Sequence, residues 1–269
     1  MFAALKEHWP EYLMEAAGLG LYMISACVFG ALLEYPLSPV HQALRDPGAR
    51  RILSGLARGL TVVGLIYSPW GKQSGAHFNP AVTLTFFWLG KVVAWDACFY
   101  IVAQFLGGLV GVLLMAALLG QWVADPAVNY AVTVPGPAGQ AIAFLAEFLI
   151  SFALMLVVLI ASNTRRAARF TGLLAAALVA IYLVVEAPYS GMSMNPARTF
   201  ASAVPAQVWT GLWLYFTAPL LGMAAGEVYL LSFGRVYCAK LHHDNDKRCI
   251  FCNSGPDLAE PNIQAARHA

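Results

Sequence analysis

Two copies of the tripeptide Asn-Pro-Ala are the residues whose types and spacing most clearly indicate chemistry. The two copies are Asn79-Pro80-Ala81 and Asn195-Pro196-Ala197. Each is typical of a helix start, because an Asn side chain accepts a hydrogen bond from a free backbone N–H and Pro suits the first helical position. The apolar stretches that follow are short, covering 79–89 and 195–204, the second ending before Pro205. Segments of this length cannot cross a hydrocarbon layer of about 30 Å, so they predict half-helices that stop midway through a membrane.

A second group with ligand chemistry lies near the end of the chain, in the segment 234–269. Its members are Cys238, His242, His243, Cys249 and Cys252. Three cysteines with nearby histidines, two of the cysteines in a Cys-x-x-Cys pair, have the ligand types and spacing of a zinc site. A compact knuckle would use either His242 or His243. The alternative is a flexible tail whose Cys and His are incidental.

Composition places most of the protein's surface in lipid. Hydrophobic residues make up 59% of the chain and charged residues only 11%, against about 25% charged residues in soluble domains, and the mean hydropathy is +0.65. A net charge of +2 is too small to argue for a nucleic-acid partner. The sequence contains no nucleophile–base pair and no phosphate-binding Gly-rich loop, so we do not expect an enzyme.

Six apolar stretches are long enough to span a bilayer. They cover about 12–33, 52–69, 94–119, 139–162, 171–187 and 208–232. One half-helix follows the second span and the other follows the fifth. We therefore expect an all-α membrane protein with six transmembrane helices and two half-helices, built from a first repeat (1–121), a linker (122–138) and a second repeat (139–233). Three spans per repeat is an odd number, so the repeats must be inverted.

Basic residues predict the orientation, because cytoplasmic loops carry an excess of Lys and Arg. With the N-terminus inside, the inner side holds Lys6, Lys72, Lys91, Arg165, Arg166, Arg169, Arg235, Lys240, Lys247, Arg248 and Arg267. The outer loops hold only Arg45, Arg50 and Arg51. Both termini, and with them the tail 234–269, are expected in the cytoplasm of a cell with this protein in its plasma or inner membrane.

The two boxes, their flanks and the surrounding helices resemble the aquaporin, or major intrinsic protein, family of channels. The resemblance covers roughly residues 10 to 233, and a bacterial type of member is expected. It implies a homotetramer with one pore in each subunit, embedded in the lipid bilayer. It implies passive flow of water without a cofactor. The candidate zinc site in the tail is separate from this expectation.

The pore follows from the half-helices, whose positive N-terminal ends would meet at the midplane and repel cations. If each Asn oxygen caps its own half-helix, each NH2 is held toward the lumen, where it orients passing water. The resemblance implies that Arg198 lines the narrowest constriction, together with Met192 and Leu183. The fourth constriction position is Arg58 or Gly59, of which we favour Arg58.

Two glutamates and one histidine accompany the boxes. Glu15 and Glu147 occupy matching repeat positions, and we expect each to brace a box by accepting bonds from unpaired backbone N–H groups. The alternative for them is a proton relay. His77 either lines the inner vestibule, where it could act as a pH gate, or packs the loop.

The sequence leaves two alternatives for the transported solute, water and other small neutral solutes. Thr199, Ala203 and the pair Tyr215-Phe216 resemble water channels rather than glycerol channels. Met192, and Leu183 in place of a His, make the filter unusual, so glycerol, ammonia or hydrogen peroxide are alternatives. Two rival classes are a secondary transporter, which also uses broken helices, and a membrane-anchored metal or redox module acting through the tail.

Overall fold

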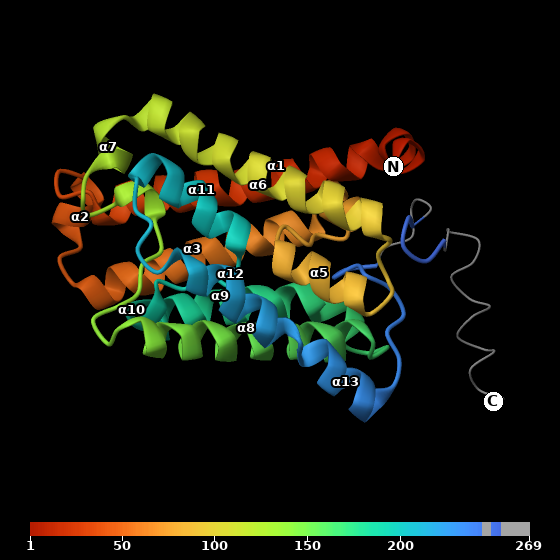
Figure 1. The fold of residues 1–269 in the computed structure, drawn as a ribbon. Coiled ribbons are helices and arrows are strands. Elements are labelled where there is room, and N and C mark those ends of the chain that lie inside the picture. The colour runs from red at the N-terminus through yellow and green to blue at the C-terminus, as the bar shows by residue number, and fades with distance from the viewer. Residues whose placement is uncertain (244–248, 254–269) are drawn as a thin grey trace.

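The computed structural model describes residues 1–243 and 249–253, and within them the chain is a bundle of helices without strands (Figure 1). The long helices are α1 (Phe2–Glu34), α3 (Pro47–Tyr67), α6 (Ala94–Leu119), α8 (Gln140–Ser162), α9 (Thr171–Val185) and the consecutive pair α12 (Leu212–Met223) and α13 (Ala225–Phe233). The short helices are α2 (Pro39–Ala43), α4 (Pro69–Ser74), α7 (Gln121–Ala124), α10 (Ala187–Ser190) and the 3-10 turns Asn129–Ala131 and Ala168–Phe170.

Five helical segments of the described chain are long and apolar enough to cross a membrane. They are Phe2–Glu34, Ala94–Leu119, Gln140–Ser162, Ala168–Val185 and Leu212–Phe233. The helix α3 is the sixth span; it has 21 residues but carries Arg50, Arg51 and Arg58, which lower its hydropathy. The expected fold of six spans is therefore confirmed, with one span more polar than the others.

The two half-helices are α5 (Pro80–Trp88) and α11 (Pro196–Ala206), and they enter the bundle from opposite ends (Figure 1). The expected end of the second at Val204 is wrong, because α11 continues through Pro205 to Ala206. A proline in the last turn costs little, since it removes only one hydrogen bond from a part of the helix that frays anyway. Gln207 ends the helix in the left-handed conformation, with φ 53°.

The last span also differs from the expected single helix, because it is interrupted at Ala224. Gly222 lies so close to α8 that a Cβ would come within 2.4 Å of the Phe148 carbonyl oxygen. Thr85 of the half-helix α5 donates to the carbonyl of Met223 at 3.3 Å. A side chain from α5 therefore satisfies a carbonyl that the interruption exposes.

Small residues bring α1 and α6 into close contact. A Cβ on Gly107 would lie 2.0 Å from the carbonyl oxygen of Ala16, and one on Gly111 would lie 2.5 Å from that of Gly20. Neither position accepts a larger residue without moving the helices apart.

The linker 122–138 is docked rather than loose. Thr133 exchanges a hydrogen bond with Thr199 at 2.8 Å between hydroxyl oxygens, and the Gly136 N–H donates to the Tyr189 carbonyl at 2.8 Å. The linker therefore covers the loop before α11.

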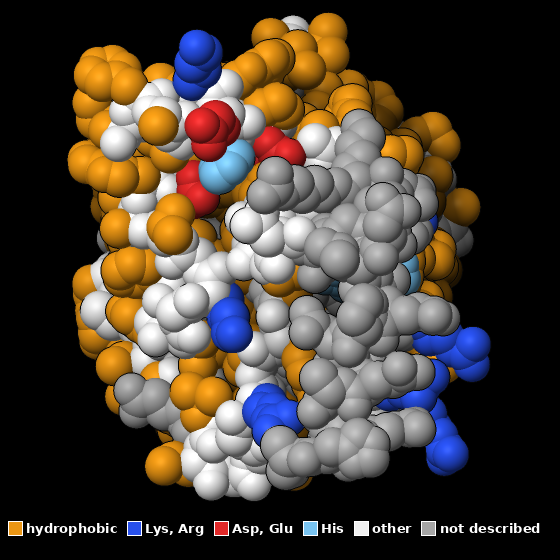
Figure 2. Space-filling model, turned by 90° about the vertical axis from the view of Figure 1, so that its right-hand side faces the viewer, with side chains coloured by type: hydrophobic (Ala, Val, Ile, Leu, Met, Phe, Trp, Pro, Cys, Tyr) orange, Lys and Arg blue, Asp and Glu red, His pale blue; other side chains and the backbone are white. Residues whose placement is uncertain are grey.

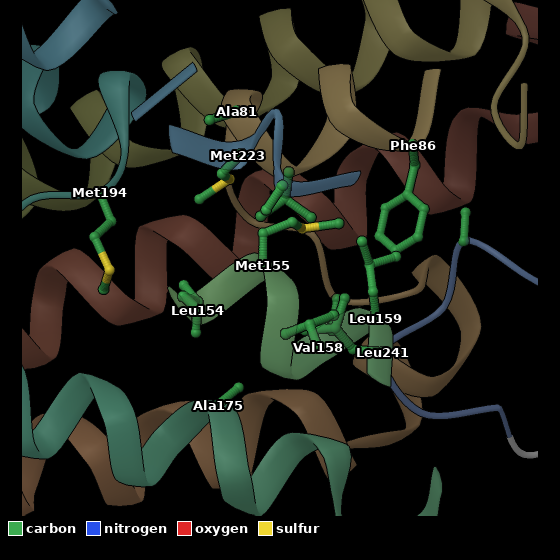
Figure 3. Close-up of a cluster of buried hydrophobic side chains, with 14 of the residues drawn as sticks. Ala81, Phe86, Leu154, Met155, Val158, Leu159, Ala175, Met194, Met223 and Leu241 are labelled. Carbon is green, nitrogen blue, oxygen red and sulfur yellow. The ribbon is translucent and has the colours of Figure 1, made fainter. Parts of the chain in front are cut away.

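The N-terminus and the end of α13 lie at the same end of the bundle, which we call the tail end (Figure 1). Figure 2 looks onto the tail end and shows Lys and Arg side chains on it. The main apolar core lies along the bundle axis: Met155, Val158 and Leu159 of α8 pack with Phe86 of α5 and with Leu241 from beyond α13 (Figure 3).

Candidate pore and the segments that cover it

The two Asn-Pro-Ala boxes cap the half-helices. The side-chain oxygen of Asn79 accepts from the Ala81 N–H at 2.9 Å. The side-chain oxygen of Asn195 accepts from the N–H groups of Ala197 and Arg198 at 3.0 and 3.1 Å. Both caps satisfy backbone donors that a helix start leaves without partners.

The same two asparagines join the loops across the middle of the bundle. Asn79 donates from its amide nitrogen to the Met194 carbonyl at 2.7 Å, and Asn195 donates to the Phe78 carbonyl at 2.7 Å. The expectation that each NH2 is held toward the lumen needs a correction, because one N–H of each amide is bonded to the opposite loop. An amide carries two N–H donors, so the crossed bonds fix each amide and leave one donor for a solute.

Glu15 of α1 lies against the loop before α5. One of its carboxylate oxygens accepts from the Ser74 hydroxyl at 2.7 Å and the His77 N–H at 3.1 Å. The other accepts from the Phe78 N–H at 2.6 Å and the Gln104 amide at 2.8 Å. Four donors thus meet one fully buried carboxylate.

Glu147 of α8 makes the equivalent contacts with the loop before α11. It accepts from the Ser190 hydroxyl at 2.7 Å, the Ser193 N–H at 2.6 Å and the Met194 N–H at 2.7 Å. The two carboxylates therefore satisfy backbone donors that irregular loops at this depth cannot give to water.

A cavity with a volume of about 110 Å³ follows the bundle axis past both boxes. One water needs only about 10–15 Å³ by this measure, so the cavity has room for water. Its lining is mostly apolar, with polar groups where the loops meet. The polar lining residues are His77, Asn79, Ser193, Asn195 and Arg198.

Arg198 is buried at one end of this cavity, with 2% of its surface exposed. Its Nε and Nη1 atoms, and Nε of the buried Arg58, have no hydrogen-bond partner in residues 1–243 and 249–253. Buried donors without protein partners need a polar solute or water.

The remaining constriction residues separate into two groups. Met192 lines the cavity and is 2% exposed, and Leu183 is buried in the same apolar core. Gly59 faces α9 instead, since a Cβ there would lie 3.0 Å from the Ala180 Cβ.

His77 is buried and bonded through both ring nitrogens. Nδ1 lies 3.1 Å from the Thr83 hydroxyl, and Nε2 lies 2.7 Å from the carbonyl of Ala239. Its ring stacks on Phe86 on one side and on Phe251 on the other. The structure places it both at the cavity wall and against the tail, so each alternative describes part of its surroundings.

The described part of the tail folds back into the bundle at the tail end. The Leu241 N–H donates to the Gly75 carbonyl at 3.1 Å, and the Lys240 ammonium donates to the Lys72 carbonyl at 2.7 Å. Ala239 is fully buried, and Leu241 itself lines the cavity. The sequence pattern gave no sign of this contact.

Four of the five candidate ligands in the tail come together. The ligand atoms of Cys238, His243, Cys249 and Cys252 all lie within 4.8 Å of one another. His242 does not join them; its ring packs edge-on against Tyr67 at 4.8 Å. The hydrogen bond from Cys238, with one from His243, lowers the pKa of the Cys249 thiol. The remaining tail residues, 244–248 and 254–269, lie outside the described residues.

Two half-helices meeting on one cavity inside a six-span bundle define a membrane channel of the inverted-repeat class. The profile of the major intrinsic protein family matches residues 4–230, so the chain belongs to that family.

Curated relatives include aquaporin NIP2-2 from Zea mays, 38% identical over 77% of this chain and 69% of the relative. Aquaporin NIP2-3 from the same plant is 35% identical over 77% and 68%. Aquaporin NIP6-1 from Arabidopsis thaliana is 36% identical over 68% and 58%. These relatives are plant proteins and lend no support to the expected bacterial type.

A solved structure has the same fold. The aquaglyceroporin from Plasmodium falciparum superposes with a TM-score of 0.65, covering 83% of this chain and 96% of its own at 20% identity. This likeness concerns the fold alone.

Proposed function

We propose that this protein is a passive channel for water and for small neutral solutes. The observation that carries the proposal is the pair of crossed bonds, Asn79 to the Met194 carbonyl and Asn195 to the Phe78 carbonyl, in the wall of a continuous cavity. They hold two amide donors at the point where both half-helices begin. A water passing this point accepts from the amides and cannot hold its place in a proton-conducting chain.

Ion exclusion follows from the charges around the same point. Each half-helix N-terminus carries roughly half a positive charge, and Arg198 adds a full one beside the second box. A cation or hydronium moving along the cavity is repelled by all three positive charges, whereas a neutral solute is not repelled. Family membership favours this channel over an enzyme or an ion-coupled transporter.

We assign the constriction to Arg198, Met192, Leu183 and Arg58, and assign Gly59 to helix packing. Two buried guanidinium groups with free donors suit a solute that has oxygen acceptors, which water and glycerol share. That observation keeps glycerol as the second candidate, with ammonia and hydrogen peroxide behind it. Thr199, Ala203 and the pair Tyr215-Phe216 continue to favour water.

Glu15 and Glu147 hold the loops in this proposal and do not relay protons, because their oxygens are taken up by three or four donors each. The inverted repeats are 1–121 and 139–233, joined by the linker 122–138. We further propose a homotetramer in the cell membrane, with the tail end in the cytoplasm. The basic residues of the tail end support that orientation. Passive flow needs no cofactor; zinc, if bound, belongs to the tail cluster.

Stopped-flow light scattering on liposomes with the purified protein tests the proposal. After an osmotic shock with an impermeant solute, we expect shrinkage faster than in empty liposomes and unchanged proton permeability. A glycerol shock then separates the candidates: re-swelling makes glycerol a substrate, and none leaves water. Flow that needs a sodium or proton gradient would instead support a transporter.

A further inference from the structure

The cavity ends at the tail end on a residue from outside the six spans. Leu241 lines the cavity and is 7% exposed, and the fully buried Ala239 accepts a hydrogen bond from His77, two residues before Asn79. Figure 3 shows Leu241 beside Val158 and Leu159 in the apolar core. A side chain in this place narrows the path of any solute that leaves the boxes toward this end.

The tail residues that lie at the tail-end opening of the cavity, which we call the mouth, fall between the clustered ligands in the sequence. Ala239 to Leu241 lie between Cys238 and His243, and Phe251 lies between Cys249 and Cys252. Phe251 stacks on the ring of His77 at 5.6 Å between centroids. Both short segments of the cluster therefore contact His77, the first through the Ala239 carbonyl and the second through the Phe251 ring, and the first also places Leu241 in the cavity wall.

The ligand atoms lie close to the spacing of a tetrahedral site. The Sγ atoms of Cys238 and Cys249 are 3.5 Å apart, and Nε2 of His243 lies 3.1 Å from Sγ of Cys252. Tetrahedral zinc, with bonds of about 2.3 Å to sulfur and 2.0–2.1 Å to nitrogen, requires about 3.8 Å between sulfurs and about 3.6 Å between sulfur and nitrogen. These two pairs would move apart by a few tenths of an ångström, and pairs as wide as 4.8 Å would close by up to about 1 Å around the ion. Three thiolates and an imidazole are the ligands of structural zinc, and soft sulfur selects zinc over magnesium or calcium.

A bound metal would help to order the tail, whereas the linker 122–138 is already held by the helices on both sides of it. The linker 122–138 covers the second loop and is held at both ends by α6 and α8. The described tail residues follow α13 in the chain and form no regular helix after Phe233. Ordering such a segment costs conformational entropy, which a cross-link between its two arms reduces.

We propose that Cys238, His243, Cys249 and Cys252 bind one zinc ion, and that the ion holds Ala239 to Leu241 in the mouth of the pore. The inference rests on the proposed channel function. The zinc-loaded tail narrows the channel and slows water flow about tenfold, and removal of zinc restores the faster flow.

Metal content and coordination test the site itself. Full-length protein purified under reducing conditions should hold about one zinc per chain after dialysis, with X-ray absorption showing three sulfur ligands and one nitrogen ligand. The double variant C249S/C252S should lose the metal, and the matched control C98S, at an exposed cysteine outside the cluster, should keep it. A metal-free protein, or a Cys238–Cys249 disulfide in its place, overturns the proposal.

Docking is measured without any flux. Hydrogen exchange at the Leu241 amide, which donates to Gly75, should be slow with zinc and about 100-fold faster after a membrane-permeant chelator, if zinc was present at about 100 times its Kd. If chelation leaves the exchange rate unchanged, the metal does not hold Ala239 to Leu241 in place, even if the protein binds zinc.

Water flux completes the test. In liposomes, chelation should raise the water permeability of the unchanged protein and of C98S about tenfold, whereas C249S/C252S should be open before chelation and insensitive to it. Leu241→Ala should keep its zinc and still conduct faster. Equal flux with and without zinc overturns the gate. If exchange responds to zinc but C249S/C252S conducts no better than empty liposomes, the proposed channel function fails and the metal-held plug stands.

Discussion

The loops before α5 and before α11 share one plan and differ in what covers them. In each loop a buried glutamate accepts hydrogen bonds from a serine hydroxyl and two backbone N–H groups. In each loop a glycine also turns the chain with positive φ, 98° at Gly75 and 79° at Gly191. A Cβ on Gly75 would meet Phe251 of the tail, and one on Gly191 would meet Thr133 of the linker. The inverted repeat thus builds two equivalent docking places, and the chain fills one with the linker 122–138 and the other with the described part of the tail.

The loops also differ in the polar groups that they carry. His77 is bonded to the tail through Nε2, whereas Arg198, in the first turn of α11, keeps two nitrogen atoms without protein partners in the described chain. Tyr100 donates to the Ser74 carbonyl and Tyr215 to the Ser190 carbonyl, so these two tyrosines occupy equivalent positions. Gln104 follows Tyr100 by four residues and gives Glu15 its fourth donor. Pro219 follows Tyr215 by four residues and has no donor to give. The first loop is therefore the more completely bonded, and the second keeps donors for solute.

Replacing the braces has the largest expected effect. In Glu15→Ala and Glu147→Ala, each buried donor left without a partner costs about 1–3 kcal/mol, so both variants should unfold at much lower temperature, Glu15→Ala at the lower of the two. Thermal unfolding in detergent measures the order. Glu15→Gln, which keeps acceptor capacity on one oxygen, is the milder control. Equal melting of all three with the unchanged protein would contradict the bracing role.

The second effect concerns selectivity at the second loop. Arg198→Ala removes a buried charge from the cavity, and lowering a barrier by about 1.4 kcal/mol raises a rate about tenfold, so we expect glycerol entry to rise by about that factor. Liposome re-swelling measures glycerol, and a pH-sensitive dye inside the liposomes measures proton leak. Arg198→Lys keeps the charge and should leak fewer protons than Arg198→Ala. Unchanged selectivity in both would remove Arg198 from the filter.

The neighbouring residues of α3 sharpen the comparison between a pore role and a packing role. Arg58→Ala should alter the ratio of glycerol to water flux and leave the melting temperature nearly unchanged, because its guanidinium lacks a protein partner at Nε. Gly59→Ala should do the reverse, since its Cβ would press on Ala176 and Ala180 at a cost of about 1–3 kcal/mol. If Gly59→Ala changes selectivity and Arg58→Ala does not, the two positions are exchanged.

Local chemistry explains how much of this could be predicted. The boxes predicted the half-helix starts, because capping by Asn and Pro depends on a few adjacent residues. Glu15 and Glu147 were paired with the boxes because a buried carboxylate and unpaired backbone N–H groups need each other. Arg58 and Gly59 differ by one residue on a helix, so a single position of register decides which of them faces α9.

The tail could not be predicted from the sequence in the same way. The contact between His77 and Ala239 joins residues 162 positions apart, and the segment that makes it has no helical period. The Cys and His types indicated zinc, but only the fold shows that His243 joins the cluster and that His242 packs on Tyr67. The bend at Ala224 was missed for a similar reason, because the partner of its exposed carbonyl is Thr85 in the other repeat.

Gln104→Ala has the smallest expected effect on water flux and tests the difference between the two glutamate braces directly. It removes one donor from Glu15 and leaves the first loop with the three donors that Glu147 has. Losing one hydrogen bond to a charged group costs about 1.5–3 kcal/mol, so we expect a modestly lower melting temperature and unchanged water flux. Gln104→Leu is the control for volume. The second loop stays in place with three donors to Glu147. A Gln104→Ala channel that no longer conducts would therefore show that the first loop needs its fourth donor to form the pore, and that the two glutamates are not equivalent.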